Sequence, residues 1–305
     1  MKLVFAGTPQ VAVPSLTALA DSEHDLTAVI TRTDAPLGRK RVLTPSPVAR
    51  AAAARQLSLV KANRLDGAAT AEIAALKPDL GVIVAYGGLV REPLLSVPRL
   101  GWINLHFSLL PRWRGAAPVQ RAVIAGDELT GATVFRLVPE LDAGPVFASF
   151  THAIDTDATS GSLLESLSVS GAELLLRVVS DLAARTARSK KQMGEATVAP
   201  KLTIEDARID WLVPAQAIYN RVRGVTPEPG AFTIVDGARL KLLRVEPAFS
   251  AQRLPAGVIC EIDKRVLIGT ETEPIELLTV QPAGKNALTA IDWWRGVAAA
   301  ELVAS

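Results

Sequence analysis

The sequence predicts an α/β protein in which a doubly wound, mostly parallel sheet of the Rossmann-like type is followed by a small C-terminal β-barrel of the OB-like type. In the first half of the chain, buried strand patterns alternate with helix-period segments, which is typical of a parallel sheet covered by helices. The second half carries closely spaced short strands. The length of 305 residues and the hydrophobic content of 49% suit two domains with substantial cores.

The strands of the parallel sheet are expected in the first half. Four runs rich in Val, Ile and Leu have the pattern of buried strands, namely KLVFAG, DLTAVITR, DLGVIVAYG and GWINLHFS. Helix-period segments lie between them at 10–21, 46–56 and 66–76. Two further strands are expected at 131–138 and 145–154, and a long amphipathic helix follows at about 159–184.

A basic polar stretch, ARTARSKKQMGEATVAPK, divides the chain and is expected to be an exposed linker. After it, a short helix from about residue 214 precedes the strand patterns FTIVDG, RLKLLRVE, GVICEID, RVLIGT and IELLTV. A last short helix is expected near 289–303. We therefore predict one domain at 1–187, a basic linker at 188–203 and a β-barrel domain at 204–305.

Composition narrows the class of protein. The apolar run in the opening MKLVFAGTPQ is too short for a signal sequence or a membrane span, so we expect a cytoplasmic protein with no membrane contact. A single cysteine, Cys260, cannot form an internal disulfide, and with only three histidines we expect no metal site. The net charge of +2 gives no global signal for a polyanion, so any nucleic-acid surface must come from local clusters of cations.

Polar groups gather where the strand GWINLHFS ends. Asn104 and His106 are two residues apart, so both side chains project from the same face near the carboxyl end of a parallel strand, where α/β sheets bind ligands. Asp142 lies in the turn ELDAG after another strand and can fold back beside them. The sequence thus brings an amide, an imidazole and a carboxylate to one edge of the sheet.

This set suits attack by an external amine on an acyl carbon. The amide of Asn104 and a protonated His106 could stabilise the oxyanion of the tetrahedral intermediate. Asp142 could orient the imidazole and favour its charged form, or pass protons from the amine through a water molecule. The spacing alone leaves a structural interpretation open, in which the three residues are an edge-strand polar pair and a turn aspartate.

The run NLHFSLLPRWRGAAPVQRAV, followed by ELDAG, resembles the signature of the folate-dependent formyltransferases. The resemblance implies that Asn104, His106 and Asp142 are the catalytic residues. It also implies that one loop binds the folate and that two backbone segments line the pterin pocket. The loop would comprise Ser108, Leu109, Leu110 and Pro111, and the two segments would comprise Val84, Ala85, Tyr86, Gly87 and Gly88 together with Leu141 and Gly144.

The second half resembles the methionyl-tRNA members of this family through APKLTIEDARIDW and LTVQPAGKNALTA. The implied function is transfer of the formyl group of 10-formyltetrahydrofolate to the amino group of methionyl-initiator tRNA, by a monomer that needs no metal. A folate-dependent hydrolase or a sugar formyltransferase sharing the first domain is an alternative, but each should carry a different second domain. A second alternative is a tRNA-binding module that has lost its active site. The presence of Asn104, His106 and Asp142 argues against it.

Two basic clusters are candidates for tRNA contact. Arg39, Lys40 and Arg41 lie in an unusually long connection that resembles the family's inserted loop, although a solvated loop is the plainer interpretation. Lys190 and Lys191 lie in the linker, which with the C-terminal barrel would bind the tRNA backbone. Three positions depart from the family pattern: Lys40 replaces a glycine, Phe107 a small residue and Glu228 an aromatic one.

Overall fold

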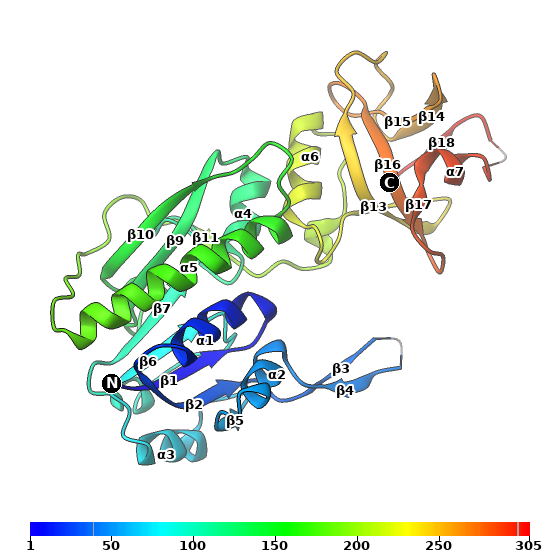
Figure 1. The fold of residues 1–305 in the computed structure, drawn as a ribbon. Helices are drawn as coiled ribbons and strands as arrows, with labels where there is room; N and C mark the ends of the chain where they lie inside the picture. Colours follow the sequence, from blue (N-terminus) through cyan, green and yellow to red (C-terminus); the bar gives the residue numbers. More distant parts are fainter. Residues whose placement is uncertain (39, 298) are drawn as a thin grey trace. The chain divides into compact units, whose positions relative to one another are not determined.

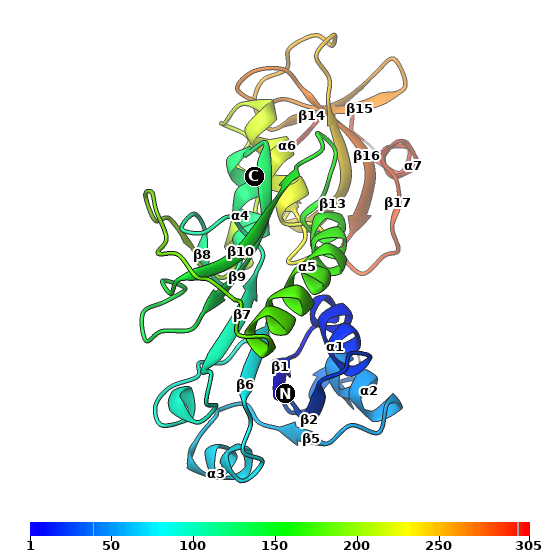
Figure 2. The same cartoon turned by 60° about the vertical axis from the view of Figure 1, so that its left-hand side comes forward.

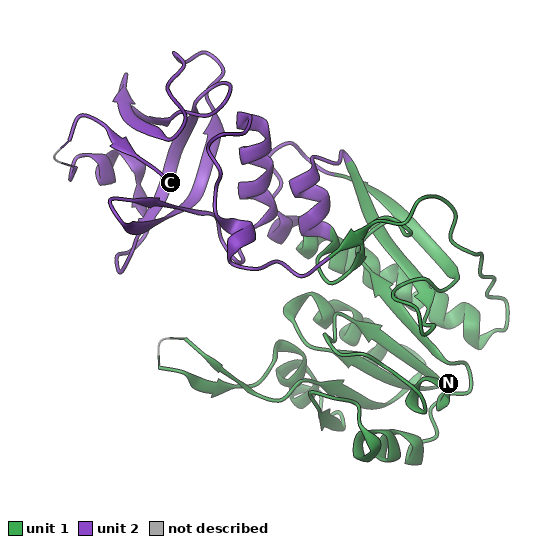
Figure 3. Ribbon diagram, turned by 180° about the vertical axis from the view of Figure 1, so that it is seen from behind, with its two compact units in different colours: residues 1–118, 129–153, 164–199 green, residues 119–128, 154–163, 200–305 purple. Residues whose placement is uncertain are grey.

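The computed structural model describes residues 1–38, 40–297 and 299–305, and these form two compact units (Figure 3). Unit 1 comprises Met1–Pro118, Leu129–Ala153 and Leu164–Ala199, and unit 2 comprises Val119–Glu128, Ile154–Leu163 and Pro200–Ser305. Each unit therefore draws on separate stretches of the chain. The domain boundaries expected at 187 and 203 stay a prediction.

Unit 1 is built on a seven-stranded sheet with the order β10-β9-β7-β6-β1-β2-β5 (Figure 1). The five strands from β7 to β5 pair in parallel, β9 pairs antiparallel with β7, and β10 pairs antiparallel with β9. The strand order reverses between β1 and β6, which makes the carboxyl ends of these strands the expected ligand-binding edge. The strands are β1 (Lys2–Gly7), β2 (Asp25–Thr31), β5 (Leu59–Lys61), β6 (Leu80–Val84), β7 (Trp102–His106), β9 (Leu129–Arg136) and β10 (Val146–Ala153).

Helices cover both faces of this sheet. On one face, α5 (Ser160–Ala183) packs against β7 (Figure 2). A Cβ on Gly171 of α5 would lie 3.0 Å from Leu105 and 3.5 Å from Phe107. On the other face, Ile73 packs in a cluster with Val4, Ile83 and Trp102. The remaining helices of unit 1 are α1 (Val13–Ala20), α2 (Pro47–Ala54) and α3 (Gly67–Ala75), with short 3₁₀ turns η1 (Gln10–Ala12) and η2 (Leu94–Ser96). The predicted doubly wound sheet is confirmed.

Unit 2 is an antiparallel sheet that closes on itself. The strand order is β12-β13-β16-β15-β14-β18, with β17 paired to β16. Closure comes from Ile234 and Ser305, whose backbones exchange hydrogen bonds of 2.9 and 3.0 Å, and from a bridge between Val235 and Ala304. The predicted C-terminal barrel is confirmed. Its strands are β12 (Phe232–Val235), β13 (Ala238–Pro247), β14 (Val258–Ile262), β15 (Arg265–Ile268), β16 (Ile275–Pro282), β17 (Leu288–Thr289) and β18 (Leu302–Val303).

The helices of unit 2 are short and pack against the core of its sheet. The core includes Trp211, Ile218, Phe232 and Trp294, each almost fully buried. The helix expected at 289–303 extends only over α7 (Ala290–Trp294), because the chain beyond it returns to pair with β14 as β18. The other helices are α4 (Pro118–Ala125), η3 (Glu205–Ala207) and α6 (Ala215–Gly224).

The long connection after β2 folds as a hairpin of β3 (Ala35–Leu37) and β4 (Val42–Thr44). Lys40 and Arg41 are exposed at its turn, whereas Arg39 lies outside the described residues. In the stretch expected to be an exposed linker, the side chains of Lys190 and Lys191 are exposed. The backbone of this stretch is nevertheless paired within unit 1, so it is no free connection. Among the described residues no helix is long and apolar enough to cross a membrane.

Candidate active site

Strand β7 carries Asn104 and His106 to the edge of unit 1 where a ligand is expected to bind. In the parallel pairing with β6, Asn104 lies opposite Ile83, and Ile83 in turn lies opposite Ala6 of β1. Asn104 and His106 therefore project from the face that carries Ile83, away from the face covered by α5. Asn104 is half-buried and His106 is 6% exposed.

The ring of His106 has two different neighbours. Its Nε2 lies 2.8 Å from the backbone carbonyl oxygen of Trp113, and its Nδ1 lies 3.8 Å from Oδ2 of Asp142. Because a carbonyl oxygen only accepts, Nε2 must carry the proton that it donates to Trp113. In the neutral ring, Nδ1 is therefore the unprotonated nitrogen and points toward the carboxylate of Asp142. This nitrogen is the basic atom of the site.

Burial sets the protonation state of His106. Desolvation lowers the pKa of the imidazole, and the nearby carboxylate of Asp142 and the carbonyl of Trp113 offset this only in part. The ring is therefore neutral near neutral pH, in contrast to the protonated His106 considered from the sequence. A proton accepted at Nδ1 would create an imidazolium next to the Asp142 carboxylate, which stabilises the charge.

Asp142 is held in a turn by backbone contacts. Its Oδ2 accepts a 2.8 Å hydrogen bond from the amide of Gly115, and its φ of 46° lies in the left-handed region that is uncommon for a residue with a side chain. Two residues later, a Cβ on Gly144 would overlap the carbonyl oxygen of Arg136. The turn ELDAG is thus packed directly against the backbone of β9, which restricts where the Asp142 carboxylate can lie.

The loop that follows β7 is tied to β9. The hydroxyl of Thr133 donates a 2.7 Å hydrogen bond to the carbonyl of Ser108 and accepts a 3.3 Å bond from the amide of Leu110. The hydroxyl of Ser108 donates to the carbonyl of Arg112 at 2.7 Å. These contacts order the predicted folate-binding loop, in which Leu109 and Leu110 are half-buried while Ser108 and Pro111 are buried.

The segment Val84–Gly88 begins at the last residue of β6 and borders the same edge. The Tyr86 hydroxyl donates to the carbonyl of Ala62 at 2.6 Å, and Thr8 donates to the carbonyl of Tyr86 at 2.9 Å. Gly87 has a φ of 78°, and its carbonyl accepts from Arg32 at 2.8 Å. These bonds anchor the buried Tyr86, while Ala85 and Gly87 are exposed. Leu141, in the turn of Asp142, is 56% exposed.

Phe107 lies on the face of β7 opposite to His106. Its side chain is buried, and a Cβ on Gly171 of α5 would come within 3.5 Å of its ring. A large residue at 107 therefore fills the layer between the sheet and α5 and does not narrow the space on the side of His106. Glu228, another position that departs from the family pattern, is an exposed residue of unit 2.

Sequence reasoning missed three residues around the trio. Trp113 supplies the carbonyl that fixes the tautomer of His106, and Gly115 supplies the amide that binds Asp142. Gln192 donates to the carbonyls of Asp142 and Gly144. Trp113 and Gly115 make these contacts through their backbones, so their side chains gave no sign of them. Gln192 is one of several polar residues in a basic stretch without periodicity, so nothing in the sequence singled it out.

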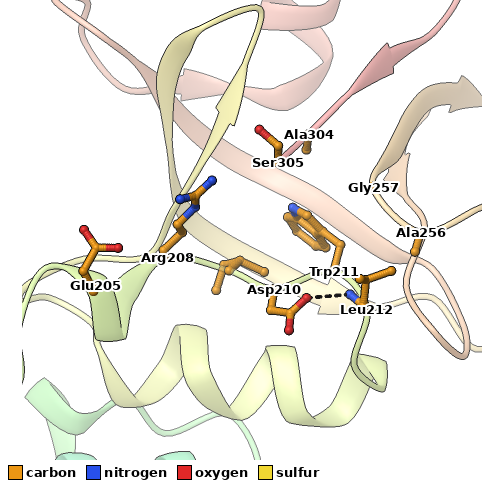
Figure 4. A pocket seen from close by; sticks show the side chains of 10 residues that line it. Glu205, Arg208, Asp210, Trp211, Leu212, Ala256, Gly257, Ala304 and Ser305 are labelled. Carbon is orange, nitrogen blue, oxygen red and sulfur yellow. Dashed lines mark hydrogen bonds between the residues drawn. The ribbon is translucent and has the colours of Figure 1, made fainter.

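Unit 2 carries a pocket of its own, with a volume of about 530 Å³ (Figure 4). Arg208, Asp210, Trp211 and Ser305 contribute to its lining. The buried indole of Trp211 donates to Thr233 at 3.0 Å, so the polar atom of the largest lining residue is satisfied within the core. Within the described part of the chain, no group of three or more His, Cys, Asp or Glu residues could hold a metal ion.

Comparisons with known proteins place this chain in a family. The model described as "Formyl transferase" matches residues 1–179, and the one described as "Formyl transferase, C-terminal domain" matches residues 201–298. The chain is 60% identical over 296 residues to "Methionyl-tRNA formyltransferase" of Leifsonia xyli subsp. xyli, covering 97% of each chain. The chain belongs to the methionyl-tRNA formyltransferase family. A relative of the same name from Clavibacter sepedonicus is 56% identical, with 100% of both chains covered.

Solved structures support the fold of this family member. A methionyl-tRNA formyltransferase from Clostridium thermocellum superposes with a TM-score of 0.58 at 15% identity, over 82% of this chain and 95% of that one. An N-formyltransferase from Helicobacter canadensis, in complex with folinic acid and dTDP-3-aminofucose, gives a TM-score of 0.69 at 17% identity, over 92% and 99%. At such identities these matches show the shared fold. The full-length relatives show that the chain is a transferase enzyme of the methionyl-tRNA type.

Proposed function

We propose that Asn104, His106 and Asp142 catalyse the transfer of the formyl group of 10-formyltetrahydrofolate to the amino group of methionyl-initiator tRNA. The observation that supports this most directly is the 3.8 Å approach of Asp142 Oδ2 to His106 Nδ1, on the same face of β7 as Asn104. Membership of the methionyl-tRNA formyltransferase family supplies the acceptor, and a folate-derived donor is typical of the wider family.

The reaction needs an acceptor for one proton and a donor to one oxygen. The lone pair of the methionyl amine forms a bond to the formyl carbon, and the carbonyl oxygen gains the negative charge. The carboxamide of Asn104 donates a hydrogen bond to this oxygen. Nδ1 of His106 takes the proton from the attacking nitrogen, and the Asp142 carboxylate stabilises the imidazolium.

Collapse of the intermediate then breaks the bond between the formyl carbon and N10 of the folate. N10 leaves with its electron pair and takes up a proton, which the imidazolium of His106 can return. The products are N-formylmethionyl-tRNA and tetrahydrofolate, so atoms and charge balance without a metal or an oxidant. In this scheme Asp142 acts through His106, one of the two roles that the sequence left open.

Folate binding is assigned to the loops that border β6 and β7. Tyr86 and Thr133 support this assignment because they order the two loops with hydrogen bonds to the backbone. The folate-contacting set we propose is Val84, Ala85, Tyr86, Gly87, Gly88, Ser108, Leu109, Leu110, Pro111, Leu141 and Gly144. One solved structure with this fold, HypX from Aquifex aeolicus, is described in complex with tetrahydrofolic acid.

For the tRNA, we propose contacts by Lys40 and Arg41 at the turn of the β3–β4 hairpin, by Arg39, which precedes them in the sequence, and by Lys190 and Lys191. The exposure of both lysines and of Lys40 and Arg41 supports this, because cations in water can neutralise phosphates and release counterions. We further propose that the enzyme works in the cytoplasm as a monomer.

The experiment is formylation of purified methionyl-initiator tRNA with 10-formyltetrahydrofolate, followed by mass spectrometry of the aminoacyl group. The expected product carries one formyl group on the amine and appears in step with tetrahydrofolate. A matched reaction with elongator methionyl-tRNA tests the acceptor. Release of free formate without formylated tRNA would instead identify a hydrolase.

A further inference from the structure

Gln192 is bonded at both ends of its side-chain amide. Its Nε2 donates to the carbonyl oxygens of Asp142 at 2.7 Å and Gly144 at 2.9 Å. Its Oε1 accepts from Arg114, at 3.2 Å from Nε and 2.6 Å from Nη2. One half-buried side chain therefore joins the turn that carries Asp142 to the strand residue beside Gly115, whose amide binds the Asp142 carboxylate.

The backbone around Gln192 is fixed on both sides. Lys190 pairs with Val146 of β10 through reciprocal hydrogen bonds of 2.7 and 2.9 Å. Downstream, the Thr197 hydroxyl accepts a 2.9 Å bond from the amide of Trp113, and β11 (Val198–Ala199) pairs with β8 (Arg114–Gly115). We name residues 190–199 the strap, because they run from β10 across the turn of Asp142 to the loop that contacts His106.

We propose that Gln192 is a positioning residue that holds the carboxylate of Asp142 against His106. This inference rests on the catalytic role proposed for Asp142. Asp142 adopts a left-handed φ of 46°, which costs free energy for a residue with a side chain. The turn therefore needs stabilising contacts from outside it. Two hydrogen bonds from one amide to the carbonyls of Asp142 and Gly144 hold that conformation.

Loss of the hydrogen bonds from Gln192 would also change the protonation of His106. The Asp142 carboxylate raises the pKa of His106 against the effect of burial, and its influence falls with distance. A turn released from Gln192 places the carboxylate less accurately, so the imidazolium is less stabilised. Turnover falls, and the pKa of His106 falls with it.

The test is a double-mutant cycle on the full-length enzyme with Gln192→Leu and Asp142→Asn, measured as single-turnover formylation. Leucine matches the size of glutamine, adds no charge and removes both hydrogen-bonding ends. We expect Gln192→Leu to lower the rate by about tenfold, within the range that small misplacements of a catalytic group cost. The acidic limb of its pH–rate profile should move to lower pH, because His106 must be neutral to act as base.

In the Asp142→Asn background, Gln192→Leu should cause no further loss, since its effect passes through the carboxylate. Gln192→Glu keeps an acceptor for Arg114 but has no N–H donors, so it should lose turnover as well. Met193→Ala is the matched control, because Met193 is the neighbouring strap residue and is 84% exposed. The folded fraction of each variant is checked by circular dichroism, and rates refer to folded enzyme.

Independent, multiplicative losses in the cycle, with Asp142→Asn itself impaired, would overturn the positioning role while leaving the proposed function standing. Full activity of Gln192→Glu would also overturn it, because the contact with Arg114 would then suffice. Normal turnover of Asp142→Asn would refute the proposed function of the carboxylate, and the inference with it.

Discussion

Gly144 offers a way to displace the carboxylate of Asp142, for which we propose a catalytic role, without replacing Asp142 itself. A Cβ at this position would overlap the Arg136 carbonyl oxygen, well inside the 3.0 Å that real Cβ atoms keep. Arg136 belongs to β9, which pairs with β7 on one side and β10 on the other, so the strand cannot yield easily. The turn of Asp142 must move instead, by on the order of an ångström.

An error of this size at a catalytic group costs about a hundredfold in rate. We therefore expect Gly144→Ala to lower turnover at saturating methionyl-tRNA and folate donor by about a hundredfold. The crowding should also cost about 1 to 3 kcal/mol of unfolding free energy, the usual range for an inserted methyl group. Single-turnover formylation measures the first effect and urea denaturation the second.

Gly67→Ala is the matched control. Gly67 begins α3 in unit 1, and a Cβ there would have no atom within 4 Å. Alanine should leave turnover unchanged and should not destabilise the fold. A folded Gly144→Ala enzyme with the turnover of the Gly67→Ala control would refute the argument that the position of this turn sets the rate.

The charges of the site and of the basic clusters lead to three further predictions. Asp142→Asn should remove much of the activity and move the acidic limb of the pH–rate profile to lower pH, because the carboxylate raises the pKa of His106; an unchanged profile would contradict the coupling. Replacing Lys190 and Lys191 with alanine should weaken tRNA binding and flatten its salt dependence, by about one unit of slope for each phosphate that is no longer neutralised; titrations across a salt series measure both, and an unchanged slope would exclude phosphate binding by these lysines. Arg39→Ala should lower turnover even at saturating tRNA, by up to about a hundredfold, if this connection positions the acceptor amine. Parental turnover would instead show that the connection is only a solvated loop.

The elements with a strong pattern could be predicted from the sequence. The runs KLVFAG, DLTAVITR, DLGVIVAYG and GWINLHFS correspond to β1, β2, β6 and β7, because strands buried on both faces are continuously apolar. β5 (Leu59–Lys61) was not predicted, since three residues at the sheet edge are too few to show a period. The hairpin of β3 and β4 was also missed, because its apolar side chains Leu37, Val42 and Leu43 are all exposed and form no buried face.

The site was predictable to the extent that side chains define it. Two-residue spacing on one strand brought Asn104 and His106 to one face, and the structure brings Asp142 to His106. The tautomer of His106 was beyond sequence reasoning, because it depends on the carbonyl of Trp113, which any residue would supply. The contacts of the strap could not be predicted either, because its backbone pairs and the hydrogen bonds of Gln192 leave no pattern in a polar and basic sequence.

The central claim is that His106, assisted by Asn104, carries the chemistry of formyl transfer. Its most direct test is single-turnover formylation of methionyl-initiator tRNA by His106→Ala and Asn104→Ala, with folate binding measured in parallel. Each variant should lose at least about a hundredfold in rate with little change in folate affinity, because removing one group that stabilises the transition state costs roughly 3 to 4 kcal/mol. A folded His106→Ala enzyme that formylates the tRNA at the parental rate would contradict the account.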